Sequence, residues 1–294
     1  MLCAAALAAV AVSAAAQTAD VPYVPTPANV VEAMLDLAKV GPDDYLIDLG
    51  SGDGRIVIAA AKERGARGLG VEIDGTLVAD ANRLAQRAGV SDRARFVEEN
   101  LHITDFRNAT VVTMYLFPRI NLELRPRLIK ELKPGARVVS HEFDMADWMP
   151  DARVTVAVPD KPYGEPRSSV YLWIVPADVS GTWRWRSQDA ALDDELTLRQ
   201  RFQMIEGEGR IGGRAARIVS GRVRGDTLAI ELAIGGGERR AQRRFAGRIE
   251  GDAVRGTLRI GEAAHEWRAV RTARGTMRVA QGAFLQHAIT EEQQ

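Results

Sequence analysis

Three glycines alternate with other residues in a short segment that directly follows an apolar run. The segment, Asp48-Leu49-Gly50-Ser51-Gly52-Asp53-Gly54, is followed by a helical pattern. Glycine lets a ligand approach the backbone closely, and the first turn of a helix offers unpaired N–H groups. A second strand ends in Glu72 about 20 residues after this segment, where such units place a carboxylate against ribose hydroxyls. These residues therefore predict a site for a nucleotide-like ligand.

The glycine spacing separates the possible cofactors. A dinucleotide fingerprint has the spacing G-x-G-x-x-G, but Arg55 occupies the position of its third glycine. A P-loop is excluded because no Gly-Lys-Ser/Thr sequence follows the segment. The remaining pattern, D-x-G-x-G-x-G over residues 48–54, resembles motif I of the class I S-adenosylmethionine-dependent methyltransferases. The resemblance implies that the cofactor is S-adenosyl-L-methionine.

Four segments resemble one branch of these enzymes in particular. They are residues 23–27, 48–55, 71–74 and 138–143. The branch is the small seven-stranded group that contains the ATP synthase c-subunit lysine methyltransferases. The same segments have a more distant likeness to the histone methyltransferases that lack a SET domain. In that group the segment before the first helix closes over the cofactor, which implies contacts from Tyr23 and Thr26. The family's adenine-binding acid aligns with Asn100, an amide whose carbonyl can still accept a hydrogen bond from an amino group.

Motif and resemblance together predict one set of cofactor contacts. The predicted cofactor-binding residues are Tyr23, Thr26, Asp48, Gly50, Ser51, Gly52, Gly54, Glu72 and Asn100. Methyl transfer from a sulfonium is an in-line displacement, so it depends on positioning more than on acid–base groups. We therefore expect most of these residues to hold and orient the cofactor.

The methyl acceptor is less well defined. Many amine and amide methyltransferases carry Asp/Asn-Pro-Pro-Tyr after the fourth strand, whereas residues 114–118 here are Met-Tyr-Leu-Phe-Pro, which argues against DNA and glutamine methylation. Tyr115 and Phe117 could flank an amine, because aromatic faces attract ammonium groups, or they could be core residues. His141 and Glu142 could help to remove a substrate proton, or they could be packing or capping residues. Tyr115 and His141 are the candidate catalytic residues.

Three functions remain open. The first is an S-adenosylmethionine-dependent N-methyltransferase that acts on a protein lysine. The second is a methyltransferase with a small-molecule acceptor, and the third is an exported, non-catalytic binding protein that retains the cofactor fold. Spermidine synthases share the glycine loop, but the expected acidic polyamine site is missing from this sequence.

Composition limits the partners. The 294 residues include 39 Lys and Arg and 39 Asp and Glu, for a formal net charge of +0, so we expect no nucleic-acid partner. The single cysteine, Cys3, lies in the N-terminal leader, and the four histidines show no metal-ligand spacing, so we expect no metal site. The oligomeric state is not indicated.

The first twenty residues have the features of a targeting segment. Residues 2–16 are an alanine-rich apolar run with small residues at its end, and residues 17–20 are polar. We expect a cleaved signal peptide over residues 1–20, and hence a periplasmic or secreted protein. A disordered leader on a cytoplasmic protein is the alternative. The run is too short to span a bilayer comfortably, so we expect no stable membrane span.

The pattern of residues 21–177 predicts an α/β fold with a doubly wound, mostly parallel seven-stranded sheet. The expected strands are residues 45–49, 69–73, 94–98, 109–116, 136–141, 154–158 and 168–175. The last two have no helix between them, so one should run antiparallel. Thr26 should cap the first helix, with Pro27 at its first position. Pro126 should kink the helix over residues 120–132 or mark its start.

After residue 177 the periodicity changes to two. Alternating apolar and polar residues indicate half-buried antiparallel strands, and Gly-Asp pairs at 225–226 and 251–252 indicate hairpin turns. Residues 178–275 therefore predict a C-terminal antiparallel β-meander, either a small barrel or a sandwich. We expect residues 276–294 to be a loosely held tail.

Overall fold

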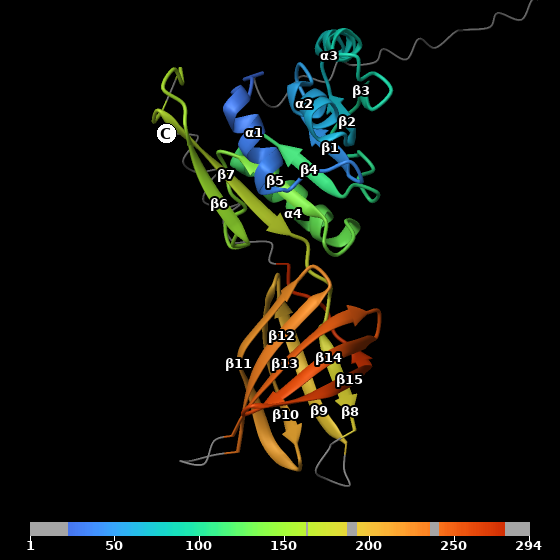
Figure 1. Ribbon diagram of the computed structural model, residues 1–294, viewed down its shortest axis with the longest axis vertical. Coiled ribbons are helices and arrows are strands. Elements are labelled where there is room, and N and C mark those ends of the chain that lie inside the picture. The colour runs from blue at the N-terminus through green and yellow to red at the C-terminus, as the bar shows by residue number, and fades with distance from the viewer. Residues whose placement is uncertain (1–22, 163, 187–192, 236–240, 280–294) are drawn as a thin grey trace, which may run out of the picture.

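The computed structural model describes residues 23–162, 164–186, 193–235 and 241–279. A layered α/β unit comes first along the chain and a β-barrel follows it, drawn below the sheet in Figure 1. The predicted signal peptide at residues 1–20 lies outside the described residues.

A seven-stranded sheet forms the centre of the first unit, with the order β3-β2-β1-β4-β5-β7-β6. Its strands are β1 (Tyr45–Leu49), β2 (Arg67–Glu72), β3 (Ala94–Glu98), β4 (Val111–Met114), β5 (Arg137–His141), β6 (Ala152–Ala157) and β7 (Arg167–Ile174). The first five strands are parallel, and β7 runs antiparallel between β5 and β6. The predicted fold and the antiparallel strand are therefore confirmed.

Strand β4 is shorter than the predicted span of residues 109–116. Its last partner is Leu49 of β1, which pairs with Met114 just before β1 turns into the glycine loop. With no neighbour on that side, the chain leaves the sheet after Met114. Tyr115 and the two residues after it therefore lie outside the ladder and can shape a site at this edge.

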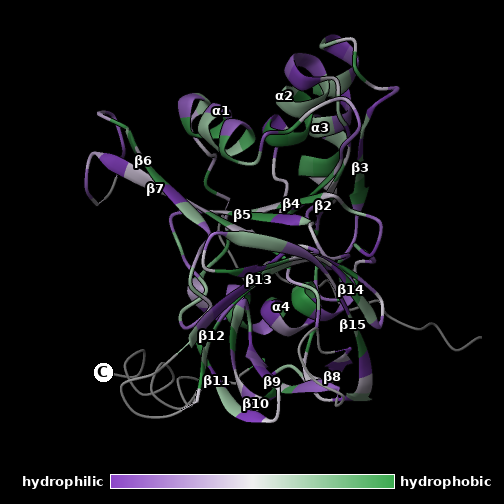
Figure 2. Cartoon of the chain, turned by 60° about the horizontal axis from the view of Figure 1, so that its bottom comes forward, coloured by the Kyte–Doolittle hydropathy of each residue, from purple (hydrophilic) through white to green (hydrophobic). Residues whose placement is uncertain are grey.

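Helices cover both faces of the sheet. They are α1 (Ala28–Leu37), α2 (Arg55–Arg64), α3 (Gly75–Arg87) and α4 (Pro118–Glu131). Figure 2 shows α1, α2 and α3 on one side of the sheet and α4 on the other. Two apolar cores result, one around Met34 and Val57 and one around Leu124 and Met114. Because both faces are buried, the central strands are mostly apolar, and polar residues in them such as Asp48, Thr113 and His141 are buried too.

One sequence prediction about helix starts is wrong, and one of the two alternatives for Pro126 is excluded. Thr26 makes no capping hydrogen bond to α1, whose N-cap residue is Pro27. Its hydroxyl instead lies 3.2 Å from His141 Nδ1, because residue 26 is buried against the end of β5. Pro126 does not start α4 but lies inside it, and Pro118 occupies the first helical turn, where a missing N–H costs nothing.

The second unit is a closed antiparallel barrel. Its strands are β8 (Gly181–Trp185), β9 (Asp194–Arg201), β10 (Met204–Ile211), β11 (Arg214–Arg224), β12 (Thr227–Ile234), β13 (Ala241–Glu250), β14 (Ala253–Ile260) and β15 (Ala263–Arg274). Gly225 and Gly251, both with positive φ, lie at the two predicted hairpin turns. Trp185, Phe245 and Trp267 pack edge to face inside the barrel. The closure of β15 on β8 shows that the unit is a barrel and not a sandwich.

The barrel joins the face of the sheet that α4 covers. The turn between β9 and β10 carries Phe202, which is 2% exposed and stacks on Trp148 with 6.0 Å between ring centroids. Phe202 belongs to the same apolar core as the buried side chains of α4. Two ion pairs of 2.6 Å add to this contact, and they join Arg201 to Asp147 and Arg222 to Asp151.

Part of the predicted loose tail is held in place. The Arg278 N–H donates to the Gln200 carbonyl at 2.9 Å, and Met277 and Val279 pack against the core that contains α4. The prediction is therefore wrong for residues 276–279, while residues 280–294 lie outside the described part. Within the described ranges, the helices are too short or too polar to span a membrane.

Candidate functional site

A cavity of about 730 Å³ opens at the carboxyl ends of β1, β2 and β4. Eight of the nine predicted cofactor-binding residues line it: Tyr23, Thr26, Asp48, Gly50, Ser51, Gly52, Glu72 and Asn100. The exception is Gly54, the N-cap of α2, where an added Cβ would lie 2.5 Å from the Phe96 ring. Gly54 thus serves the packing of α2 on β3. The cavity volume lies in the range of small-molecule sites.

The glycine loop is held by β2. The N–H groups of Gly50 and Ser51 both donate to the Val71 carbonyl at 2.9 Å, and the Gly52 N–H donates to a Glu72 carboxylate oxygen at 2.9 Å. Gly50 and Gly52 have φ values of 76° and 53°, a region that side chains disfavour. The loop therefore turns back over β2 and brings its backbone to the cavity wall.

Residues 23–27, which we term the strap, close one side of the cavity. Arg55 anchors it by donating to the Thr26 carbonyl at 2.9 Å, and its guanidinium pairs with Asp53 at 2.6 Å. The Tyr23 ring lies so close to the glycine loop that a Cβ on Gly52 would be 2.5 Å from it. Burial, together with the Asp53 carboxylate, raises the pKa of Tyr23. Strap and glycine loop therefore pack directly on each other.

Glu72 lies at the end of β2, as the spacing predicted. One carboxylate oxygen accepts from the N–H groups of Ile73 at 2.8 Å and Asp74 at 3.2 Å, and the other accepts from Gly52. These bonds fix the side-chain orientation at the cavity wall. A carboxylate offers about four acceptor sites and these three bonds use three of them, so capacity remains for one ribose hydroxyl.

Asp48 is the most deeply buried carboxyl group at the cavity, with 2% of the residue exposed. It accepts a hydrogen bond of 2.7 Å from the Thr113 hydroxyl. Burial, reinforced by the nearby Glu72 and Asp53 carboxylates, raises the pKa of Asp48 to about 7. A cationic ligand in the cavity would favour the ionised form of this group.

Several lining residues were not among the predictions. They include Asp53, Arg55, Asp74, Glu99, Leu101 and His102. The first two lie within or beside the glycine motif, and the others follow the ends of β2 and β3. Their position after parallel strands was the available signal, since the carboxyl ends of such strands meet at one edge.

Asn100 has a structural role besides lining the cavity. Its side-chain carbonyl accepts from the His102 N–H at 2.9 Å, which forms a tight turn directly after β3. A carbonyl oxygen has a second lone pair, so this bond is compatible with recognition of an adenine amino group.

The two candidate catalytic residues occupy different positions. Tyr115 lines the cavity, whereas His141 is 1% exposed and lies behind it, with the ring centroids 3.9 Å apart. Phe143 stacks on Tyr115 at 6.3 Å, and Phe117, which is 43% exposed, lies 6.5 Å from Phe143. We call these four residues the aromatic cluster. It connects the cavity wall to the molecular surface.

His141 is electrically neutral near pH 7. Burial lowers its pKa to about 4, and the Lys161 charge also lowers it, although the Glu142 carboxylate opposes the shift. Lys161 pairs with Glu142 at 3.0 Å. His141 therefore has the position of a residue that supports Tyr115 and the strap rather than one that touches the ligand.

These residues fit S-adenosylmethionine. The Ser51 hydroxyl lines the cavity and is buried without a hydrogen-bond partner among the described residues, so a polar ligand group can satisfy it. The Asp48 and Glu72 carboxylates complement a cationic ligand that carries ribose hydroxyls. The close packing of strap on glycine loop accounts for the need for glycine at position 52.

Known proteins share this sheet unit. Residues 48–152 match the family model of the ANTKMT methyltransferase domain. A protein-lysine N-methyltransferase from Saccharolobus islandicus is 46% identical over 156 residues, which is 53% of this chain and 94% of that protein. The ATP synthase c-subunit lysine N-methyltransferase of Mus musculus is 39% identical over 132 residues, which is 44% of this chain and 52% of the mouse protein. The chain thus spans about half the length of the mouse relative.

A solved structure described as an RNA methyltransferase from Salinibacter ruber, in complex with S-adenosyl-L-homocysteine, is 49% identical. The match covers 53% of this chain and 96% of that one, with a TM-score of 0.48. The match to almost the whole Saccharolobus islandicus protein decides the family. The chain belongs to the S-adenosylmethionine-dependent protein-lysine methyltransferases.

Proposed function

We propose that this protein transfers the methyl group of S-adenosylmethionine to the ε-amine of a lysine in a protein substrate. The observation that carries the proposal is the aromatic cluster, which leads from the cavity wall at Tyr115 to the exposed ring of Phe117. Aromatic faces attract ammonium and methylammonium groups, so the cluster suits a lysine side chain that enters from outside. The relative from Saccharolobus islandicus is itself described as a protein-lysine N-methyltransferase.

The charge of the cavity favours a cationic acceptor. Its carboxylates are Asp48, Asp53, Glu72, Asp74 and Glu99. The Arg55 guanidinium is the main opposing charge, and Asp53 neutralises it at 2.6 Å. A phosphate backbone is repelled by such a wall, whereas a lysine ammonium is attracted to it. The charge therefore supports a lysine over RNA as the acceptor.

The protein's own part in the reaction is to position the reactants and exclude water. When bound, S-adenosylmethionine supplies an electrophilic methyl group on a sulfonium. The glycine loop and Glu72 would hold the ribose side, and the strap closes one side of the cavity. Tyr115, supported from behind by His141, orients the incoming amine. Holding two reactants in line converts a bimolecular step into an effectively unimolecular one.

Tyr115→Ala tests the aromatic cluster in the full chain. Loss of the ring that orients the amine should lower kcat/KM for a protein acceptor about 100-fold. The Kd of S-adenosylhomocysteine, measured by calorimetry, should change less than about threefold. Tyr45→Ala is a matched control, because Tyr45 is a partly buried tyrosine of β1 that does not line the cavity.

The methyl acceptor is identified by locating the label in the methylated product. Incubation of the protein with cell extract and methyl-labelled cofactor should place the label on lysine side chains, identified by mass spectrometry of digested protein. Label in RNA or in dialysable small molecules, with none on lysine, would refute the lysine assignment while leaving methyl transfer intact.

A further inference from the structure

We infer that Arg127 of α4 is a positioning residue for cofactor binding, because it holds the loop after β3 in the shape that the adenine group needs. The inference rests on the proposed placement of adenine beside Asn100. Residues 99–105, which we term the adenine loop, connect β3 to the segment that leads into β4. Asn100, Leu101 and His102 of this loop line the cavity.

Short-range hydrogen bonds give the adenine loop its turn. The His102 N–H donates to the Asn100 side chain at 2.9 Å, and the Ile103 N–H donates to the Asn100 carbonyl at 3.0 Å. The Thr104 hydroxyl donates to the same carbonyl at 3.2 Å. All three bonds join residues of the loop itself, so they shape the turn but do not fix it relative to the rest of the protein.

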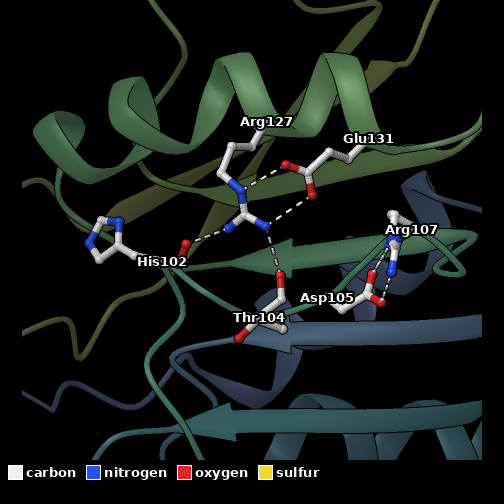
Figure 3. Close-up of polar contacts among 6 residues, drawn as sticks. All are labelled: His102, Thr104, Asp105, Arg107, Arg127 and Glu131. Atoms are coloured by element: carbon white, nitrogen blue, oxygen red, sulfur yellow. Dashed lines mark hydrogen bonds and ion pairs between the residues drawn. The ribbon is translucent and has the colours of Figure 1, made fainter.

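Arg127 attaches the loop to α4, as Figure 3 shows. The His102 ring lies 3.8 Å from a Glu123 carboxylate oxygen of the same helix, a longer contact. Its guanidinium donates to the His102 carbonyl at 2.6 Å and to the Thr104 carbonyl at 2.9 Å. Further N–H groups of the same guanidinium bind both oxygens of Glu131, one turn further along α4, at 2.9 Å each. One planar group therefore binds two loop carbonyls and is itself oriented by a carboxylate.

The packing around the guanidinium reinforces this arrangement. Its central carbon lies 4.6 Å from the centroid of the Phe106 ring, which is fully buried at the end of the loop. A guanidinium can stack on an aromatic face and present a rigid fork of donors at the same time. Lysine has neither property, so Arg127→Lys keeps the charge but not the two simultaneous bonds.

The position of the adenine loop matters for the cavity. Its lining residues follow β3 directly and lead up to the His102 and Thr104 carbonyls that Arg127 binds. Loss of the attachment would let Asn100 and His102 shift relative to Glu72, whose carbonyl accepts from the Glu99 N–H at 2.9 Å. The ribose and adenine contacts would then no longer fit one ligand. The inference concerns cofactor affinity, because Tyr115, His141 and Phe143 lie at the ends of β4 and β5, and Phe117, the N-cap of α4, lies at the start of that helix, more than two turns before Arg127.

The experiment compares Arg127→Gln and Arg127→Lys with the unmodified full chain. Calorimetry gives the Kd of S-adenosylhomocysteine and of S-inosylhomocysteine, in which a carbonyl replaces the adenine amino group. We expect Arg127→Gln to weaken S-adenosylhomocysteine binding about tenfold, and Arg127→Lys to have a smaller effect, because two charge-assisted bonds are lost or weakened. The ratio of the Kd of S-inosylhomocysteine to that of S-adenosylhomocysteine should also fall, more in Arg127→Gln than in Arg127→Lys.

Steady-state kinetics provides a second readout. In Arg127→Gln the KM for S-adenosylmethionine should rise about tenfold, while kcat at saturating cofactor and the KM for the acceptor stay within about twofold. Arg107→Gln is the matched control, since the bonds that Figure 3 draws from Arg107 join it to Asp105 at the end of the same loop and not to α4. That variant should behave like the unmodified protein.

Each outcome has a defined meaning. A lower Tm with unchanged Kd, ligand preference and KM would show that Arg127 only stabilises the fold and would overturn the inference. An equal loss in Arg107→Gln would also overturn it. If the unmodified protein bound S-adenosylhomocysteine but methylated no lysine, the acceptor assignment would fail while the role of Arg127 would still be decided by the Kd values.

Discussion

At the residue scale, Asp48 shows how the site prepares for a cationic ligand. The carboxyl group is buried beside two other carboxylates, and its pKa is raised from 3.8 to about 7. A raised pKa means that the fold favours the protonated form. The stability that this provides is fully present below about pH 4 and is lost as the pH rises through about 7. Above that pH, the ligand-free protein carries an unfavourable buried charge.

Asp48→Asn should therefore stabilise the ligand-free protein more at pH 8 than at pH 5, by about 1 kcal/mol or more, because a larger part of the stabilisation is lost at the higher pH. The amide keeps an oxygen that can accept from the Thr113 hydroxyl. Thermal unfolding at both pH values measures the effect. Asp36→Asn, at a carboxylate that is 63% exposed, is the control and should show no gain at pH 8. Equal stability of Asp48→Asn and the unmodified protein at pH 8 would contradict the prediction.

At the element scale, the strap and the glycine loop act together. The strap is attached through Arg55 and through the contact of Thr26 with His141, so it is tied both to α2 and to β5. Its Tyr23 ring packs where a side chain on Gly52 would lie. The contact between the strap and the glycine loop can therefore be tested by a substitution at Gly52 alone.

Gly52→Ala should raise the Kd of S-adenosylhomocysteine at least about tenfold, because the new Cβ would lie 2.5 Å from the Tyr23 ring and displace the strap. Gly89→Ala is the matched control. Gly89 has a φ of 71° but no atom within 4 Å of an added Cβ, so this variant has a similar backbone strain without the collision. Calorimetry should show unchanged affinity for Gly89→Ala. Equal affinities of the two variants would show that the strap is not held by this contact.

At the scale of the whole molecule, the barrel is joined to the sheet unit by a packed contact. Phe202 enters the core that also contains Trp148 and Trp173, although it belongs to a barrel hairpin and has a φ of 51°. The Gln203 side chain adds a hydrogen bond of 2.6 Å to the Met149 carbonyl. Such a contact couples the unfolding of the two units.

Phe202→Ala should lower the free energy of unfolding by about 3 kcal/mol, as expected for loss of a buried phenylalanine. It should also turn one denaturation transition into two, since the core contact between the units is lost. Urea denaturation followed by tryptophan fluorescence measures this, because both units contain tryptophan. Val219→Ala, at a barrel position that is 57% exposed, should leave a single transition. A single, unshifted transition in Phe202→Ala would mean that the units are not coupled through this residue.

Much of this architecture could be predicted from the sequence because it depends on local pattern. The apolar run before Asp48 and the alternation after residue 177 identify parallel sheet and antiparallel strands without knowledge of any contact. The end of β4 could not be predicted in this way. The apolar sequence continues beyond Met114. The strand stops at Met114 because its neighbour β1 stops at Leu49, the last residue that pairs with it.

The same distinction between local pattern and tertiary contact applies to the residues of the candidate site. Gly50, Gly52 and Glu72 were identifiable because their conformations and spacing are local requirements of a strand, a loop and a helix start. The packing role of Gly54 was not identifiable, because its partner Phe96 comes from β3, two strands further along the chain. Arg127 was not identified, because an arginine on a helix surface has no local sign of binding a distant loop.

By itself, therefore, the sequence determined the two kinds of fold, the glycine loop and the class of cofactor, since these depend on backbone conformation and residue periodicity. The tertiary structure alone decided that Thr26 contacts His141, 115 positions away, and that Arg127 binds the adenine loop. It also decided that the barrel joins the face of the sheet covered by α4, through Phe202. The physical reason is that these contacts depend on the order of the strands in the sheet, which brings distant residues together and has no local signature.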